Sequence, residues 1–172
     1  MKKPILTIMI GLPRSGKSTW IKKNKKDAVV VSPDEIRAKI FGHQFHSNAE
    51  DFIWAFAKAM CRLLLEQGKD VIIDATNINS YSRNVWINIG KQYKAKVRMI
   101  WTKTSVQKCL QRNKGEKSVP KDVILKMAHV FETPSLEYLD KDIELIEIPK
   151  YKTKKYLYNY YESQLSLLNK EN

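Results

Sequence analysis

Short apolar runs alternate with amphipathic stretches along the whole chain. Near-continuous apolar or β-branched runs predict five strands, at residues 5–10, 28–32, 71–75, 95–101 and 143–148. Apolar positions at helical spacing predict helices between them, at about 18–25, 34–41, 48–67, 79–93, 104–113 and 120–131. Uninterrupted apolar strands are typical of a parallel sheet with helices on both faces. The pattern therefore predicts a doubly wound α/β fold with a five-stranded parallel sheet in a single domain.

The segment at 48–67 has the clearest helical pattern. Its large apolar residues form one stripe, made of Phe52, Phe56, Met60, Leu63 and Leu64. Charged residues lie opposite the stripe, at Asp51, Lys58, Arg62 and Glu66. We expect this stripe to be the buried face of the helix.

The final stretch differs in composition from the rest. Residues 1–150 contain the predicted α/β domain, and residues 151–172 predict a C-terminal helical extension of it. Leucine and tyrosine recur there at helical spacing, which favours packing against the domain or against a second subunit of a homo-oligomer; the residues are Leu157, Tyr161, Leu165 and Leu168. Lysines and tyrosines in the same stretch also suit stacking and charge contacts with nucleic acid.

Composition narrows the class of protein. A chain of 172 residues with 43% hydrophobic content can bury the core of one domain. Its net charge of +13 favours a polyanionic partner, although a lysine-rich surface alone would give the same value. Cys61 and Cys109 lie in apolar helical segments without metal-ligand spacing, as reduced core residues do. Without an apolar run long enough for a membrane span, we expect a cytoplasmic protein.

The most informative motif follows the first strand. Residues 11–18 read Gly-Leu-Pro-Arg-Ser-Gly-Lys-Ser and fit the phosphate-loop pattern G-x-x-x-x-G-K-[ST]. Lys17 is expected to reach the β and γ phosphates, and Ser18 to offer its hydroxyl to Mg²⁺. The residues predicted to surround the nucleotide here are Gly11, Pro13, Arg14, Ser15, Gly16, Lys17, Ser18 and Thr19. The motif predicts binding of a nucleoside triphosphate with Mg²⁺.

Asp34 and Arg37 follow the second strand. A carboxylate at this strand end can accept the proton of an attacking hydroxyl, but Asp34 also suits a helix N-cap or first turn. Arg37 lies one turn later, where it could grip an acceptor phosphate or pair with Asp34 at i,i+3. The residues alone leave both alternatives open.

Two further features belong to the expected site. Asp74 ends the third strand, where it can hold Mg²⁺ through water or orient the acceptor; a capping role is the weaker alternative. The loop at about 112–120 carries Arg112, Lys114 and Lys117, which can close over a triphosphate as a lid. A solvated lysine-rich loop is the alternative for this stretch.

Together these motifs resemble the kinase domain of phage-type polynucleotide 5′-kinases, within the P-loop kinase group. The matching stretches are residues 6–8 and 11–20, Asp34 with Arg37, residues 73–77, Arg112-Asn113 and Val119-Pro120, in order over about residues 1–135. The resemblance implies ATP as donor, Asp34 as general base and Arg37 as the ligand of the phosphate beside the acceptor hydroxyl. It also implies that Asp74 supports the site and that Arg112 and other basic lid residues clamp ATP.

The chain departs from that family in two respects. The family has a second lid arginine one helical turn after the first, and here this position is Glu116. Either Lys114 or Lys117 then substitutes or the role is lost, and lysine is a less directional phosphate ligand than arginine. The bifunctional members of the family continue into a phosphatase domain, and no counterpart of that domain follows the last predicted strand here, so a 3′-phosphatase activity is not expected.

Three functions fit the sequence. The leading hypothesis is ATP-dependent phosphorylation of the 5′-hydroxyl end of RNA or DNA. One alternative is a small-molecule kinase for a nucleoside, sugar or sugar nucleotide. The other is a nucleic-acid-binding module gated by a nucleoside triphosphate, with little transfer activity.

Overall fold

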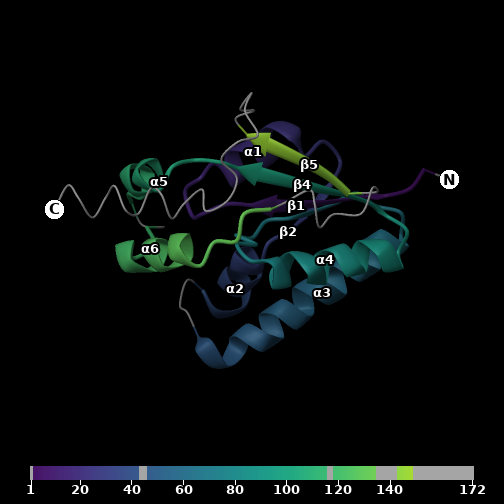
Figure 1. Cartoon of the computed structure of the whole chain (residues 1–172). Coiled ribbons are helices and arrows are strands. Elements are labelled where there is room, and N and C mark those ends of the chain that lie inside the picture. Colours follow the sequence, from purple (N-terminus) through teal and green to yellow (C-terminus); the bar gives the residue numbers. More distant parts are fainter. Residues whose placement is uncertain (1, 43–45, 116–117, 135–142, 149–172) are drawn as a thin grey trace.

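A single parallel sheet organises the molecule (Figure 1). The computed structural model describes residues 2–42, 46–115, 118–134 and 143–148. The strands are β1 (Ile5–Ile10), β2 (Val29–Val31), β3 (Val71–Ile73), β4 (Lys96–Thr102) and β5 (Ile143–Ile148). They lie in the order β2-β3-β1-β4-β5, and each neighbouring pair is parallel. The predicted five-stranded parallel sheet is confirmed.

Helices connect successive strands. They are α1 (Lys17–Asn24), α2 (Pro33–Phe41), α3 (Glu50–Glu66), α4 (Ser80–Gln92), α5 (Val106–Arg112) and α6 (Lys121–His129). A 3₁₀ turn, η1 (Ser47–Ala49), leads into α3. Every strand and helix expected within residues 1–150 occurs, with its ends within two residues of the expected ones.

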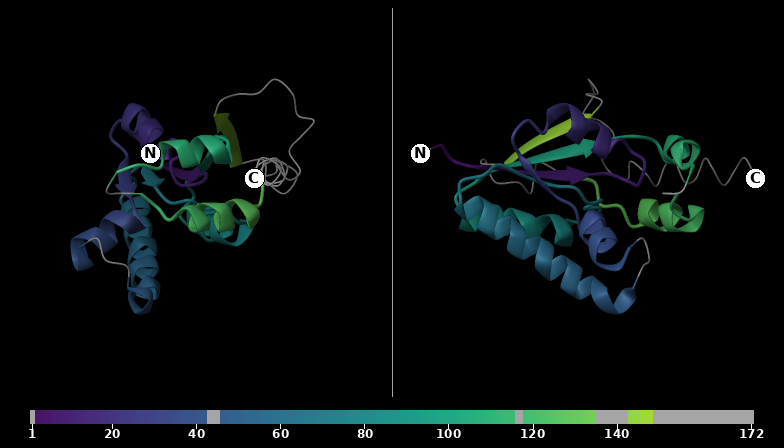
Figure 2. Two further views of the ribbon diagram at one scale, coloured as in Figure 1. Left: turned by 90° about the vertical axis from the view of Figure 1, so that its left-hand side faces the viewer. Right: turned by 180° about the vertical axis from the view of Figure 1, so that it is seen from behind.

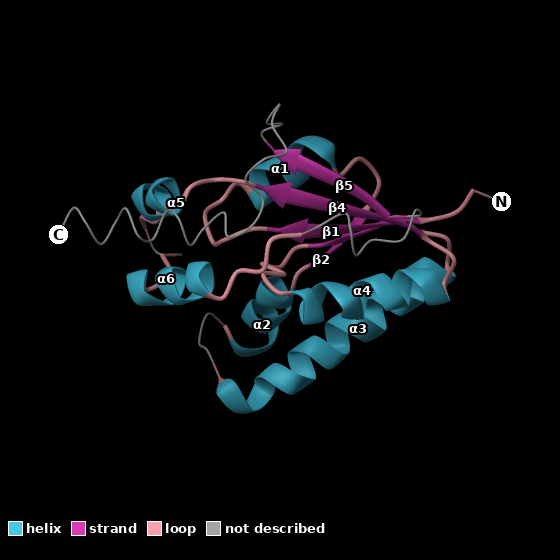
Figure 3. Ribbon diagram, viewed as in Figure 1, coloured by secondary structure: helices cyan, strands magenta, loops and turns pink. Residues whose placement is uncertain are grey.

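The two faces of the sheet are covered by different helices (Figure 3). Successive residues of a strand point to opposite faces. Leu6, Ile8 and Ile10 of β1 pack in the main core with residues of α3 and α4. Met9 points the other way and packs with Ile21 of α1. Because β1 is buried on both faces, its sequence is apolar at nearly every position.

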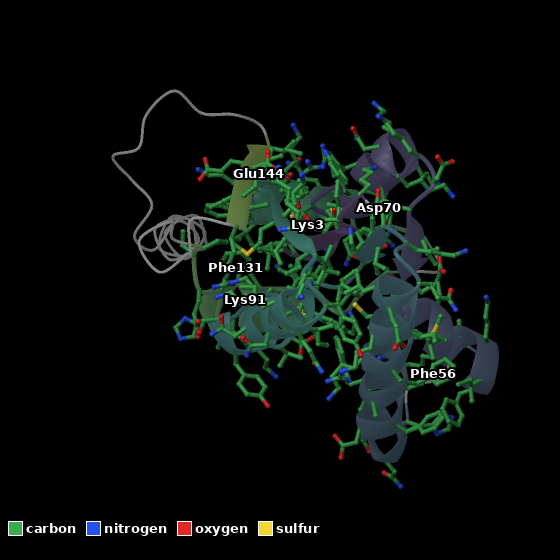
Figure 4. All side chains as sticks on the ribbon, turned by 90° about the vertical axis from the view of Figure 1, so that its right-hand side faces the viewer. Lys3, Phe56, Asp70, Lys91, Phe131 and Glu144 are labelled. Atoms are coloured by element: carbon green, nitrogen blue, oxygen red, sulfur yellow. The ribbon has the colours of Figure 1, made fainter. Side chains whose placement is uncertain are left out.

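The expected buried face of α3 is only partly right, because Met60 and Leu64 pack against the main core and the other three residues do not. Phe52, Phe56 and Leu63 are 55%, 43% and 55% exposed, and Figure 4 shows Phe56 on the side of α3 turned away from the sheet. The buried face lies about a quarter turn or more away and consists of Ile53, Ala57, Cys61 and Leu65. Two of these four side chains are small, which lets α3 lie close to the sheet.

Helices α5 and α6 lie in front of the carboxyl ends of the strands (Figure 2, left). Leu12 packs in a buried cluster with Val106 and Cys109 of α5 and with Ala128 of α6. Leu12 belongs to the predicted phosphate loop. The two helices that flank the expected lid loop, α5 and α6, therefore pack directly against the phosphate loop. Cys61 and Cys109 are both buried and unbonded to each other, as expected.

Two further expectations concern membrane-spanning helices and the C-terminal residues. Among the described residues no helix has the length and apolar content to cross a membrane. The helical extension expected at residues 151–172 lies outside the described residues and stays a prediction.

Candidate active site

The phosphate loop joins β1 to α1 and is held by backbone hydrogen bonds, one within the loop and one to the segment after β3. The N–H of Gly11 donates to the carbonyl of Thr76 at 3.0 Å, and the N–H of Ser15 donates to the carbonyl of Leu12 at 3.2 Å. Gly16 precedes α1 with a φ of 109°, a value that glycine adopts without strain. The loop therefore ends at the amino end of α1, where free N–H groups and the helix dipole favour an anion.

Two threonines from the end of β4 brace the same loop. The hydroxyl of Thr102, which is 3% exposed, lies 2.6 Å from the hydroxyl of Ser15 and donates to the carbonyl of Ile10 at 3.1 Å. The hydroxyl of Thr104 donates to the carbonyl of Ser15 at 2.7 Å. Sequence reasoning missed both threonines. Their signal was available, because β4 neighbours β1 and its carboxyl end must lie beside the loop.

Lys17 lies buried inside the loop. Its Nζ donates to the carbonyls of Gly11 and Leu12, at 2.9 Å each. Burial lowers the pKa of Lys17 to about 8, and the nearby charge of Asp74 only partly opposes this effect. Phosphate oxygens are stronger acceptors for an ammonium than backbone carbonyls are. Lys17 is thus placed to exchange its loop contacts for a nucleotide.

A cavity of about 990 Å³ opens beside the loop, towards the ends of β4 and β5. That volume is at the upper end of the range of about 300–1,000 Å³ for small-ligand sites and accommodates a nucleoside triphosphate. Its lining contains six cationic side chains, Arg14, Lys17, Lys23, Lys103, Lys108 and Arg112. In the described part of the chain, no carboxylate lines it. Such a cavity attracts polyanions.

Asp34 and Arg37 lie on the opposite side of the loop from this cavity. The strand order places β3 and β2 on one side of β1, and β4 and β5 on the other. Ser32 caps α2 by accepting from the N–H of Glu35 at 3.3 Å, so Asp34 is not the cap residue. The side chain of Asp34 is 87% exposed. Burial lowers the pKa of Lys17 and raises that of Asp74; the charge of Asp34 slightly opposes the first shift and adds to the second, so Asp34 lies within electrostatic reach of both.

Arg37 is held by two carboxylates. It donates to Asp34 at 2.6 Å, which is the ion pair considered in the sequence, and makes two bonds to Glu50, at 2.7 and 2.9 Å. The hydrogen bond to Glu50 is the main reason that the pKa of Arg37 is raised. Sequence reasoning missed Glu50, because nothing in the local pattern of α3 distinguishes it from a solvated first-turn acid.

Asp74 lies between the nucleotide cavity and the pair Asp34 and Arg37, and its charge interacts with both Lys17 and Asp34. It follows β3 directly, and the hydroxyl of Ser18 is near enough to favour its charged form slightly. Burial raises its pKa, and the charge of Lys17 opposes this shift. Mg²⁺ prefers oxygen ligands and usually takes one or two from the protein beside phosphate and water. Ser18 and Asp74 fit that requirement, although the described residues contain no cluster of three or more metal-ligating side chains.

Most of the expected nucleotide-binding residues line the cavity, namely Arg14, Ser15, Gly16, Lys17, Ser18, Thr19 and Arg112. Gly11 and Pro13 belong to the loop but do not line the cavity. Lys114 contacts Arg14 through its backbone carbonyl at 3.3 Å, and Lys117 lies outside the described residues.

Comparison with known proteins agrees with this geometry. A family model described as an AAA domain matches residues 6–134, which include the loop, Asp34, Arg37, Asp74 and Arg112. The chain belongs to this AAA domain family. Its fold is that of P-loop kinases: a gluconokinase from Sinorhizobium meliloti 1021 covers the whole of both chains with a TM-score of 0.57 at 13% identity.

Two relatives have higher sequence identity. An L-seryl-tRNA(Sec) kinase of Methanococcus maripaludis is 31% identical over 143 residues, 78% of this chain and 55% of the relative. A chain of the Pnkp1/Rnl/Hen1 RNA repair complex is 28% identical, with a TM-score of 0.68 over 76% of this chain and 44% of that one. The chain thus spans about half the length of each. The resemblance to P-loop kinases is confirmed.

Proposed function

We propose that this domain transfers the γ-phosphoryl group of ATP to the 5′-hydroxyl end of RNA or DNA. The observation that carries the proposal is the pair Asp34 and Arg37 on α2, one turn apart and 2.6 Å from each other. A polynucleotide acceptor offers a hydroxyl to activate and a phosphate one nucleotide away, and a carboxylate beside a guanidinium matches both. The net charge of +13 and the likeness to a chain of an RNA repair complex support it.

The chemistry follows from the two halves of the site. The 5′ oxygen forms a bond to the γ-phosphorus while the bond from that phosphorus to the β–γ bridging oxygen breaks, and ADP leaves. Asp34 accepts the proton of the hydroxyl. Lys17 and Arg112 offset the negative charge on the phosphates, and Arg37 fixes the acceptor. Phosphoryl transfer has a loose transition state, so this positioning and charge neutralisation supply most of the catalysis.

Mg²⁺ enters with the nucleotide in this proposal. Ser18 and Asp74 would hold it from the protein side, since the serine hydroxyl and the carboxylate supply oxygen ligands near Lys17. When bound, the ion neutralises part of the charge on the phosphate oxygens.

A second candidate is phosphorylation of a hydroxyl carried by a tRNA. The 31% identity to the L-seryl-tRNA(Sec) kinase favours it. In that case Asp34 would activate a serine hydroxyl, and Arg37 would bind phosphate or ribose near the 3′ end of the tRNA. The basic surface suits either nucleic acid, so acceptor chemistry must distinguish the two candidates.

A transfer assay with matched acceptors separates them. The wild-type chain receives γ-labelled ATP, Mg²⁺ and one of four acceptors: a 5′-hydroxyl oligoribonucleotide, its 5′-phosphorylated form, a seryl-tRNA or gluconate. We expect label on the 5′-hydroxyl oligonucleotide and none on its phosphorylated form. Label on the serine of the tRNA alone would establish the second candidate. Label on gluconate alone, or tight ATP binding without any transfer, would contradict both.

A further inference from the structure

Arg14 occupies a backbone position in the phosphate loop that favours glycine. Its φ is 65°, in the left-handed region. A residue with a side chain is strained there. Such strain persists only where surrounding contacts hold the residue in place, and it is frequent at functional positions. The contacts of the Arg14 side chain therefore indicate what holds this residue in its strained conformation.

The guanidinium of Arg14 reaches the lid. Its Nε donates to Oδ1 of Asn113 at 3.4 Å, and one Nη donates to the carbonyl of Lys114 at 3.3 Å. Asn113 also closes the lid loop, because its amide donates to the carbonyl of Val119 at 2.6 Å and accepts from the N–H of Val119 at 2.9 Å. Arg14 thus contacts the residue that ties together the two ends of the lid loop.

The same side chain borders the nucleotide cavity, together with Lys17 and Arg112. Its lid bonds of 3.3 and 3.4 Å exceed the usual range of about 2.7–3.2 Å and are weak. A guanidinium bound to phosphate makes charge-assisted bonds roughly twice as strong as neutral ones. The planar guanidinium presents its N–H donors in a fixed fork that suits phosphate oxygens.

We propose that Arg14 binds the terminal phosphate of the donor nucleotide and thereby holds the lid over it. The positive charge that closes the site then comes from the phosphate loop, and not from the lid position occupied in the sequence by Glu116. The inference rests on the proposed kinase function, but it does not depend on which acceptor is used.

The test compares Arg14→Gly, Arg14→Lys and a control, Lys94→Gly. Glycine relieves the strain at φ 65°, so the first variant removes the guanidinium without straining the loop. Lys94 is an exposed lysine with a φ of 54°. It lies just before β4, at the amino ends of the strands and so at the other end of the sheet from the phosphate loop. Calorimetry measures the dissociation constants of a non-hydrolysable ATP analogue and of ADP. Tryptic cleavage at Arg112 and Lys114, with and without each nucleotide, reports lid closure.

We expect Arg14→Gly to bind the ATP analogue about tenfold more weakly, to bind ADP within twofold of wild type, and to lose nucleotide protection of the lid. Arg14→Lys should fall between, and Lys94→Gly should match wild type. Unchanged affinity and protection in Arg14→Gly would overturn the inference, as would an equal loss for ATP analogue and ADP. If the Arg14 effects appear while no acceptor is phosphorylated, the proposed function fails and the role of Arg14 in nucleotide binding stands.

Discussion

The guanidinium of Arg37 and the carboxylate of Glu50 face each other in a double hydrogen bond that joins α2 to the start of α3. Nε lies 2.7 Å from Oε1, and one Nη lies 2.9 Å from Oε2. The other Nη lies 2.6 Å from Asp34. The Arg37 side chain is only 16% exposed, so the two carboxylates fix its direction. Glu50 is therefore a positioning residue for the acceptor side of the proposed site.

Glu50→Gln is expected to raise the KM for a 5′-hydroxyl oligonucleotide about tenfold, because the neutral amide cannot make the same charged double bond to Arg37. The dissociation constant for ATP should stay within twofold, since Glu50 does not line the nucleotide cavity. Steady-state kinetics with each substrate varied in turn measures both. Glu66→Gln, at the far end of the same helix, is the control. An unchanged oligonucleotide KM in Glu50→Gln would remove Glu50 from this role.

Gly11→Ala is expected to abolish nucleotide binding. A Cβ at Gly11 would overlap the hydroxyl of Thr102 and lie 2.6 Å from that of Ser15, so the loop must shift. Gly68→Ala is the matched control, because Gly68 also has a positive φ, 74°, but nothing within 4 Å of an added Cβ. Calorimetric titration with ATP compares the two variants. Equal affinity in both would show that the close packing of Thr102 against the loop is unimportant for binding.

ATP binding should become pH-dependent above pH 8. The pKa of Lys17 is lowered to about 8 by burial, so the free protein loses this positive charge as the pH rises through that value. Bound phosphates favour the charged form and raise the pKa again, so binding at pH 9 must take up a proton. Calorimetry at pH 9 in buffers of different ionisation enthalpy detects this uptake. The same titration at pH 6.5 should show none from Lys17, and equal heats in all buffers at pH 9 would contradict the assignment.

Asp74→Asn should move this pH dependence to lower values. Among the charges near Lys17, Asp74 does most to raise its pKa, so its removal lets burial lower the pKa further. The rate of phosphoryl transfer should also fall about 100-fold, since the phosphate loop loses the negative charge that helps to keep Lys17 protonated. Asp122→Asn, on the exposed first turn of α6, controls for the loss of one carboxylate. An unshifted pH profile would show that Asp74 and Lys17 are not coupled.

Sequence pattern predicted the sheet well and the exposed face of α3 badly, for a physical reason. Strands such as β1 are buried on both faces, so an unbroken apolar run leaves little choice of structure. Helix α3 is apolar around most of its circumference, so its sequence pattern alone does not show which apolar side faces the core. The stripe of large residues predicts the wrong side for Phe52 and Phe56. Close approach to the sheet selects smaller side chains, Ala57 and Cys61, and leaves Phe52 and Phe56 outside.

The candidate site divides in the same way. The phosphate loop could be predicted because its chemistry requires a fixed local pattern, and Asp34 and Asp74 because each follows a strand. The contacts of Thr102 with Ser15 and of Glu50 with Arg37 join residues 87 and 13 positions apart. Such contacts depend on how elements pack, and no local periodicity encodes them.

The proposed function requires that Asp34 activate a 5′-hydroxyl held opposite the phosphate loop. The most direct measurement is single-turnover transfer from γ-labelled ATP to a 5′-hydroxyl oligoribonucleotide by wild type, Asp34→Asn and Glu35→Gln. Glu35 is the next residue on the same exposed turn, so it controls for the local charge. We expect Asp34→Asn to lower the rate about 1,000-fold with unchanged ATP affinity, and Glu35→Gln to match wild type. Transfer by Asp34→Asn at the wild-type rate would contradict the claim.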